Sequence, residues 1–143
     1  MKSHPSFFIF SGIIKPIWMK TKLTLTILGV INILQAIAYT AAAKPAVDMM
    51  FNVGEEAASL AVMFQYAISP AFLMIGLMQL FSRNLDVDAA KRILLAVIIA
   101  YIPLFFVFNT MMSSPLTNMG VGDFAIDIVM FSLAVFTYFK PKA

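Results

Sequence analysis

The stretch Ile93–Ser113, with the sequence ILLAVIIAYIPLFFVFNTMMS, decides the fold class of this chain. It contains no charged residue, and about 20 apolar residues in a helix are enough to cross the ~30 Å hydrocarbon core of a bilayer. Leu23–Ala43 and Ala57–Ser82 are equally free of charge, and Gly120–Phe139 contains only two acids. The sequence therefore predicts an all-α membrane protein, in which four transmembrane helices form one bundle.

The composition agrees with this class and limits the chemistry. The chain of 143 residues is 62% hydrophobic and 12% charged, whereas soluble domains average about 25% charged residues. We expect one transmembrane domain over residues 19–143, with spans at about 23–43, 57–82, 93–113 and 120–139. There is no cysteine, and His4 is the only histidine. Disulfides, thiolate ligands and histidine-based metal or haem sites are therefore not expected within the bundle.

The positive charges predict how the chain is threaded. Nine of the ten Lys and Arg residues fall on one side of the four spans: Lys2, Lys15, Lys20, Lys22, Arg83, Lys91, Arg92, Lys140 and Lys142. Lys44 alone falls on the other side. By the positive-inside rule, both termini are predicted on the cytoplasmic side, or on the matrix or stromal side in an organelle. Because these charges flank the spans, the net charge of +3 favours lipid headgroups over nucleic acid as the partner.

The N-terminal region allows more than one interpretation. Residues 1–18 contain the apolar run Phe7–Ile14, which is too short to span a bilayer and predicts an interfacial arm. From Met19 onward, a basic start, an apolar stretch and the ending Ala41-Ala42-Ala43 resemble a signal peptide cleaved after Ala43. The apolar stretch is long for such a peptide, so we favour a retained first span.

Two local patterns predict how the helices begin and meet. Asp86 or Asp88 is placed to cap the start of the third span, and Glu55-Glu56 falls in the first turn of the second, where the helix dipole favours acids. Small residues such as Gly29 and Gly76 are expected to permit close contact between helices.

Polar side chains inside the spans are the candidates for a functional site. Grouped by span, they are Asn32, Gln35 and Tyr39; Gln65 and Ser69; Tyr101 and Asn109; and Asp123 and Asp127. Their spacing places each group on one helix face. At a rise of ~1.5 Å per residue, Gln35, Gln65 and Asp127 are expected roughly 10–12 Å below the outer surface. Because such groups are costly against lipid, we expect them to converge inside the bundle.

As ligand-binding or proton-responsive candidates we select Asp127, Gln35, Gln65, Asn109, Tyr39 and Asn32. The amides and the phenol have an alternative role as hydrogen-bonding contacts between helices, worth about 0.6–2 kcal/mol each. Asp123 is interpreted as an acid in the first turn of its helix. Asp127, one turn deeper, is costly unless protonated, paired or hydrated. It is therefore either a functional group or a carboxyl hydrogen-bonded to Gln35, Gln65 or Asn109.

The overall pattern resembles a family of small four-span bacterial membrane proteins known as DoxX-like. The resemblance rests on four spans of similar size, on Gly29-x-x-Asn32 in the first span and on the basic connector Arg83–Arg92. The chain lacks the basic residue that DoxX-like proteins often carry in the first helix. The resemblance implies a four-helix fold in a bacterial inner membrane, and it implies no particular activity because the family has no common established one.

Two functions from different classes follow from these observations. The first is a non-enzymatic accessory or scaffold subunit that packs against other membrane subunits or itself, without a cofactor. The second is a binder or carrier of a lipid, an isoprenoid or quinone, or a proton-coupled solute. A ligand-sized pocket lined by Gln35, Gln65, Asn109 and Asp127 favours the second function, and a dry hydrogen-bonded network of the same residues favours the first.

Overall fold

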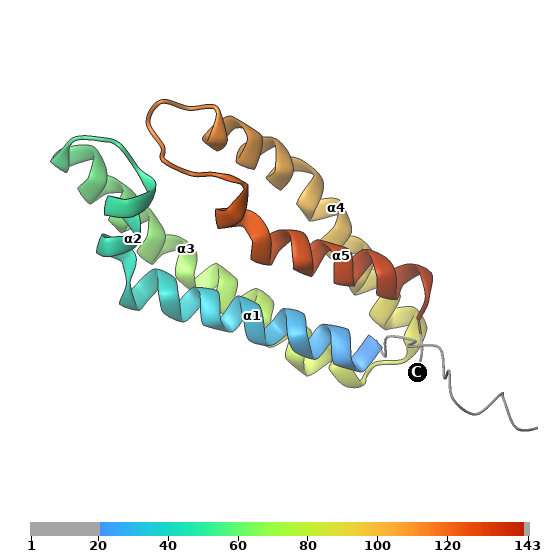
Figure 1. Ribbon diagram of the computed structural model, residues 1–143. Helices are drawn as coiled ribbons and strands as arrows, with labels where there is room; N and C mark the ends of the chain where they lie inside the picture. The colour runs from blue at the N-terminus through green and yellow to red at the C-terminus, as the bar shows by residue number, and fades with distance from the viewer. Residues whose placement is uncertain (1–20, 142–143) are drawn as a thin grey trace, which may run out of the picture.

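The computed structural model describes residues 21–141, and this part of the chain is built from helices without a strand. Figure 1 shows α1 (Thr21–Ala41), α3 (Glu55–Phe81), α4 (Val87–Met112) and α5 (Ala125–Phe139) as a bundle of long rods. With the 3-10 turns η1 (Ser82–Asn84) and η2 (Val121–Phe124), they form four segments long and apolar enough to cross a membrane. The four predicted spans are confirmed, and the fold is that expected of a multi-pass membrane protein.

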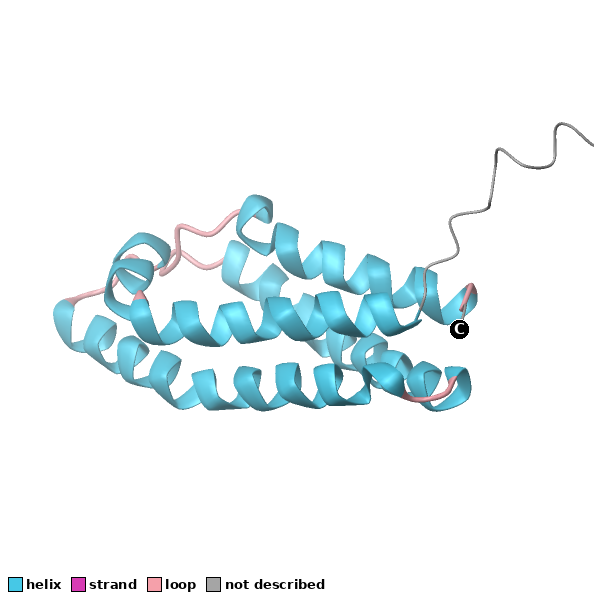
Figure 2. Cartoon of the chain, turned by 90° about the horizontal axis from the view of Figure 1, so that it is seen from below, coloured by secondary structure: helices cyan, strands magenta, loops and turns pink. Residues whose placement is uncertain are grey.

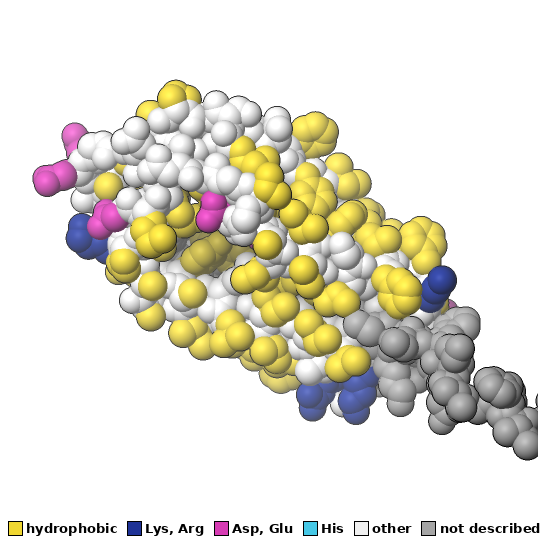
Figure 3. Space-filling view, in the orientation of Figure 1, with side chains coloured by type: hydrophobic (Ala, Val, Ile, Leu, Met, Phe, Trp, Pro, Cys, Tyr) yellow, Lys and Arg dark blue, Asp and Glu magenta, His cyan; other side chains and the backbone are white. Residues whose placement is uncertain are grey.

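The charged side chains gather at the two ends of the bundle. Figure 3 shows Lys and Arg at the end where α1 begins, and most of the acidic side chains at the opposite end, with hydrophobic side chains between them. We call the first the basic end. It carries Lys22, Arg83, Lys91, Arg92 and Lys140. The cytoplasmic placement of this end stays a prediction, and the proposed arm of residues 1–18 lies outside the described residues.

Helices α1 and α3 approach closely enough for their backbones to touch. A Cβ atom on Gly76 would lie 2.7 Å from the carbonyl oxygen of Gly29, so these two glycines permit the close contact that was predicted. Nearer the opposite end, the Ser69 hydroxyl donates to the carbonyl oxygen of Ala36 at 2.8 Å and lies 2.7 Å from the Thr40 hydroxyl. The pair is therefore joined by backbone packing and by hydrogen bonds.

Helices α4 and α5 pack through aromatic rings. The rings of Phe105 and Phe131 meet edge to face at 5.1 Å, and those of Phe108 and Phe124 stack at 3.9 Å. The neighbouring Phe106 points outward and is 72% exposed. Near the basic end, a 2.7 Å contact between the fully buried hydroxyls of Thr24 and Thr137 links α1 to α5.

A short helix and two loops close the end opposite the basic end. Helix α2 (Ala43–Met50) was not predicted from the sequence, and it buries Ala43 and Val47. The amide of Asn52 donates to the carbonyl oxygen of Leu116 at 2.8 Å, and that of Asn118 donates to Met50 at 2.9 Å. We call residues 50–52 and 116–118 the clasp. Figure 2 shows both loops at this end, where the clasp ties the α1–α3 pair to the α4–α5 pair.

The predicted helix starts are confirmed. The Asp86 carboxylate accepts a 2.9 Å hydrogen bond from the amide of Ala89 and caps α4. Glu55 and Glu56 lie in the first turn of α3. Asp123 lies in η2, at the start of the fourth span, and accepts from the amide of Gly120 at 2.7 Å.

Candidate functional site

A cavity of about 210 Å³ lies between the four long helices. Most of its wall is apolar and comes from Leu28, Phe72, Ile75, Val97, Ala100, Leu104 and Met130. Four polar side chains also reach the cavity, namely Asn32 from α1, Gln79 from α3, Tyr101 from α4 and Asp127 from α5. An apolar cavity with a few convergent polar groups is the usual form of a small-molecule site.

One polar wall of the cavity is a pair of amides. The side-chain nitrogen of Asn32 donates to the side-chain oxygen of Gln79 at 3.0 Å and to the carbonyl oxygen of Leu28 at 2.9 Å. Both amide side chains are buried, with 6% and 4% exposure. This pair joins α1 to α3, and it satisfies part of the hydrogen-bonding capacity of each amide inside the bundle.

The facing wall carries the carboxyl group. The Tyr101 hydroxyl donates to the Asp127 carboxylate at 3.3 Å. The Tyr101 ring is held by Phe105 and Phe131, at centroid distances of 5.6 and 5.7 Å. The Gln35 side chain lies near the same carboxyl group. A phenol and an amide, from two different helices, therefore converge on one intramembrane acid.

Tyr39 is the other phenol near this acid. It is close enough to interact electrostatically with Asp127, and its ring meets Phe72 edge to face at 5.2 Å. Because Phe72 lines the cavity, Tyr39 supports the cavity wall from behind.

Two buried acceptors inside the bundle lack a donor. The side-chain oxygens of Gln35 and Gln65 are buried and accept no hydrogen bond within the described part of the chain. An unsatisfied buried polar atom costs about 1–3 kcal/mol, and such atoms in a native fold require an explanation. A water molecule or a bound molecule would supply the missing donor to Gln35.

The structure brings together only some of the candidate residues selected from the sequence. Asn32 and Asp127 line the cavity, with Gln35 and Tyr39 next to Asp127. Gln65 is not at that level. It precedes Ser69 by one turn, and Ser69 already bonds to the last turns of α1. The sequence analysis expected a pocket lined by Gln35, Gln65, Asn109 and Asp127. Of these four residues, only Asp127 lines the cavity.

Asn109 is exposed and does not line the cavity, so the structure does not place it beside Asp127 in this wall. Residues eight apart in a helix turn through about 800°, which leaves them roughly 80° from a shared face. Tyr101 is accordingly buried, whereas Asn109 is exposed.

Sequence reasoning overlooked Gln79 and did not select Tyr101. Gln79 lies close to the end of its span, where a polar residue draws little attention. A signal was present, however, in the spacing of the α3 residues that face α1: Gln65, Ser69, Phe72, Gly76 and Gln79. Alternating steps of four and three residues define one seam of a packed helix, and that seam includes Gln79.

Metal chemistry receives no support from the described residues. Within residues 21–141, no group of three or more His, Cys, Asp or Glu side chains is arranged to hold a metal ion.

No protein-family model, curated protein or solved structure matches the chain. The resemblance to DoxX-like proteins therefore stays a prediction. The class defined by the fold is that of a multi-pass helical membrane protein with a mostly apolar cavity that four polar side chains reach.

Proposed function

We propose that this chain is a non-enzymatic membrane protein that binds a small amphiphilic molecule within the bilayer. The observation that carries this proposal is the cavity between the four helices, because its wall is mostly apolar and yet contains Asp127 and Tyr101. A purely structural polar network has little reason to leave such a space beside a carboxyl group, since dense packing is the norm in protein interiors.

The membrane context of the proposal follows from the charge pattern. We propose a bacterial inner membrane, with the basic end on the cytoplasmic side, where positive charges are retained. The cavity then lies well inside the hydrocarbon core. Asp127 is thirteen residues from Lys140, which corresponds to about 20 Å along the helix.

Native mass spectrometry with a cavity-filling variant tests this proposal. Ala100 lines the cavity, so Ala100→Trp is expected to occupy it, whereas Ala96 is exposed one turn away and is not part of the lining. We expect the wild-type protein, extracted gently from its own membrane, to retain a small molecule. Ala96→Trp should retain it as well, and Ala100→Trp should lose it. A wild-type protein without such a molecule, or an Ala100→Trp protein that keeps it, would contradict the proposal.

A second candidate function is an accessory subunit, which binds other membrane subunits or a second copy of itself. It is favoured by α3, which packs against α1 and α2, while only 11% of its most apolar segment is buried within the chain. The same spectra separate the two functions. A stoichiometric protein partner and no small molecule would favour the accessory subunit.

A further inference from the structure

Hydrogen-bond acceptors outnumber donors around Asp127. A carboxylate offers about four lone-pair sites. The side-chain donors found near it are three, the Tyr101 hydroxyl, the Gln35 amide and the Tyr39 hydroxyl. The side-chain oxygen of Gln35 is buried and has no donor. Exchanging the oxygen and nitrogen of the Gln35 amide does not restore the balance, because it turns an acceptor toward an acceptor. A ligand that brings hydrogen-bond donors would therefore complete this site.

The same region has an acidic group without a cationic partner among the described residues. The described basic residues lie at the ends of the helices, and the ion pair found in residues 21–141 joins Lys44 to Asp48 at 3.7 Å, near the clasp. The groups found to interact with Asp127 from α1 and α4 are Gln35, Tyr39 and Tyr101, none of which is a cation. A carboxyl group at this depth is expensive unless something compensates it, and a cationic ligand would do so.

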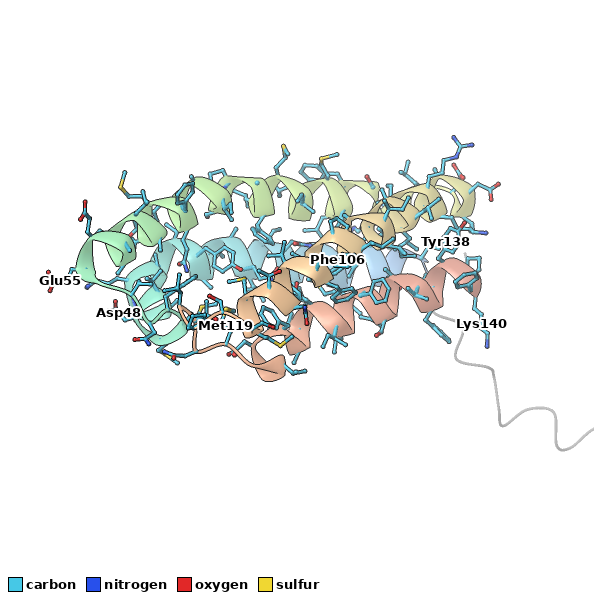
Figure 4. All side chains as sticks on the ribbon, turned by 90° about the horizontal axis from the view of Figure 1, so that it is seen from above. Asp48, Glu55, Phe106, Met119, Tyr138 and Lys140 are labelled. Carbon is cyan, nitrogen blue, oxygen red and sulfur yellow. The ribbon has the colours of Figure 1, made fainter. Side chains whose placement is uncertain are left out.

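The cavity is open toward the bilayer. Figures 1 and 4 show that α3 and α4 separate from their short connection at the basic end toward the clasp. Each packs mainly against a different helix, α3 against α1 and α4 against α5. Two lining residues, Ile75 from α3 and Ala100 from α4, are exposed, Ile75 by 42%, so the cavity is not enclosed between these two helices. Because this flank faces lipid tails in a membrane, a ligand can arrive from the hydrocarbon phase.

The size and lining of the cavity limit the ligand further. A volume of about 210 Å³ holds roughly seven non-hydrogen atoms, at the ~30 Å³ that a water molecule occupies in the liquid. The apolar wall requires most of those atoms to be carbon. The rings of Phe72 and Tyr101 border the same space, and aromatic faces attract cations.

We propose that the ligand of this cavity is a small amphiphilic amine, bound with its ammonium group between Asp127 and Gln35 and its carbon chain against Phe72, Ile75 and Leu104. This inference rests on the proposed function, since it requires the cavity to hold a small molecule. It adds the chemical class of that molecule. The ammonium group supplies three hydrogen-bond donors and the positive charge, and the chain fills the apolar part.

Two probes of equal size test the ligand class. Hexylamine and 1-hexanol each have seven non-hydrogen atoms, and the amine alone carries a charge at neutral pH. Their dissociation constants for the purified protein in a non-ionic detergent are obtained from the concentration dependence of the melting temperature. For the wild-type protein and Ala96→Trp, we expect hexylamine to bind about tenfold or more tightly than hexanol, because hydrogen bonds to a charged group are the stronger ones.

The variants identify the groups responsible. Asp127→Asn is expected to remove the preference for the amine. Gln35→Met keeps the chain length and removes both the unpaired oxygen and the amide donor near Asp127. It is expected to reduce the preference for the amine, and it provides a second test if Asp127→Asn does not fold. Ala100→Trp should weaken both probes.

The binding data distinguish a wrong ligand class from the absence of a binding site in the cavity. One outcome is that both probes bind wild type equally, that Ala100→Trp weakens the binding of both, and that Asp127→Asn changes neither. The cavity is then a binding site, but the proposal of an amine ligand is wrong. If neither probe stabilises wild type more than Ala100→Trp, both proposals are wrong.

Discussion

Replacing Gly76 by alanine tests the packing on which the cavity depends. The added Cβ would lie 2.7 Å from the carbonyl oxygen of Gly29 and 2.8 Å from the Cγ1 atom of Ile33. The first distance is about 0.7 Å shorter than an ordinary van der Waals contact of 3.4 Å. Because the obstacle is helix backbone and not the end of a flexible side chain, α1 and α3 must move apart.

The expected magnitude is the balance of two opposing effects. Overpacking a tight contact costs typically 1–3 kcal/mol. Alanine regains roughly 0.4–1 kcal/mol, because it restricts the unfolded chain more than glycine does. We therefore expect Gly76→Ala to destabilise the protein by about 1–2 kcal/mol. Gly29→Ala should act in the same direction, since its Cβ would lie 2.8 Å from the carbonyl oxygen of Gly76.

Gly122→Ala is the matched control. No atom lies within 4 Å of the position of its Cβ, and its backbone does not adopt the left-handed conformation that favours glycine. The same chemical change should therefore be neutral or slightly stabilising there.

The measurement is the fraction of protein that remains monodisperse on gel filtration after heating in a mild detergent. We expect the Gly76→Ala midpoint to fall several degrees below that of Gly122→Ala. Equal midpoints for the two variants would refute the close contact between α1 and α3.

Three further predictions concern the polar pair, the helix cap and the orientation. A double-mutant cycle with Asn32→Ala and Gln79→Ala should give a coupling of about 0.6–1.7 kcal/mol, because the two side chains bond at 3.0 Å; additive effects would show that they do not interact. Asp86→Ala should cost about 0.5–2 kcal/mol of stability through loss of the cap, while Asp86→Asn, which still caps, should remain near wild type; equal losses would contradict the capping role. Since the chain has no cysteine, single cysteines at Asn84 and Asn118 report orientation: a membrane-impermeant maleimide should label only Asn118→Cys on intact cells, and the reverse pattern would overturn the predicted topology.

The elements that could be predicted depend on local sequence. The absence of charge over each span determines that it is a membrane helix, whatever its neighbours are. The Asp86 cap was predictable because it depends on a residue three positions away. Helix α2 was not, because it is short and gains its stability from burying Ala43 and Val47 against other parts of the fold.

The site was predictable only in part. The cost of a carboxyl group in lipid singles out Asp127 from composition and depth alone. Its partners depend on how each helix is rotated. A rotation of roughly 80° along α4 separates Tyr101, which bonds to Asp127, from Asn109, which is exposed. No local pattern in α4 shows which of the two faces α5.

The sequence by itself determined four apolar spans, one basic end and an intramembrane acid, because hydrophobicity and charge act residue by residue. The tertiary structure decided which polar groups meet. The contact between Gly29 and Gly76 sets α1 against α3, and the aromatic packing of Phe105 on Phe131 sets α4 against α5. These contacts join residues far apart in the chain, so the cavity beside Asp127 exists only once the helices have packed.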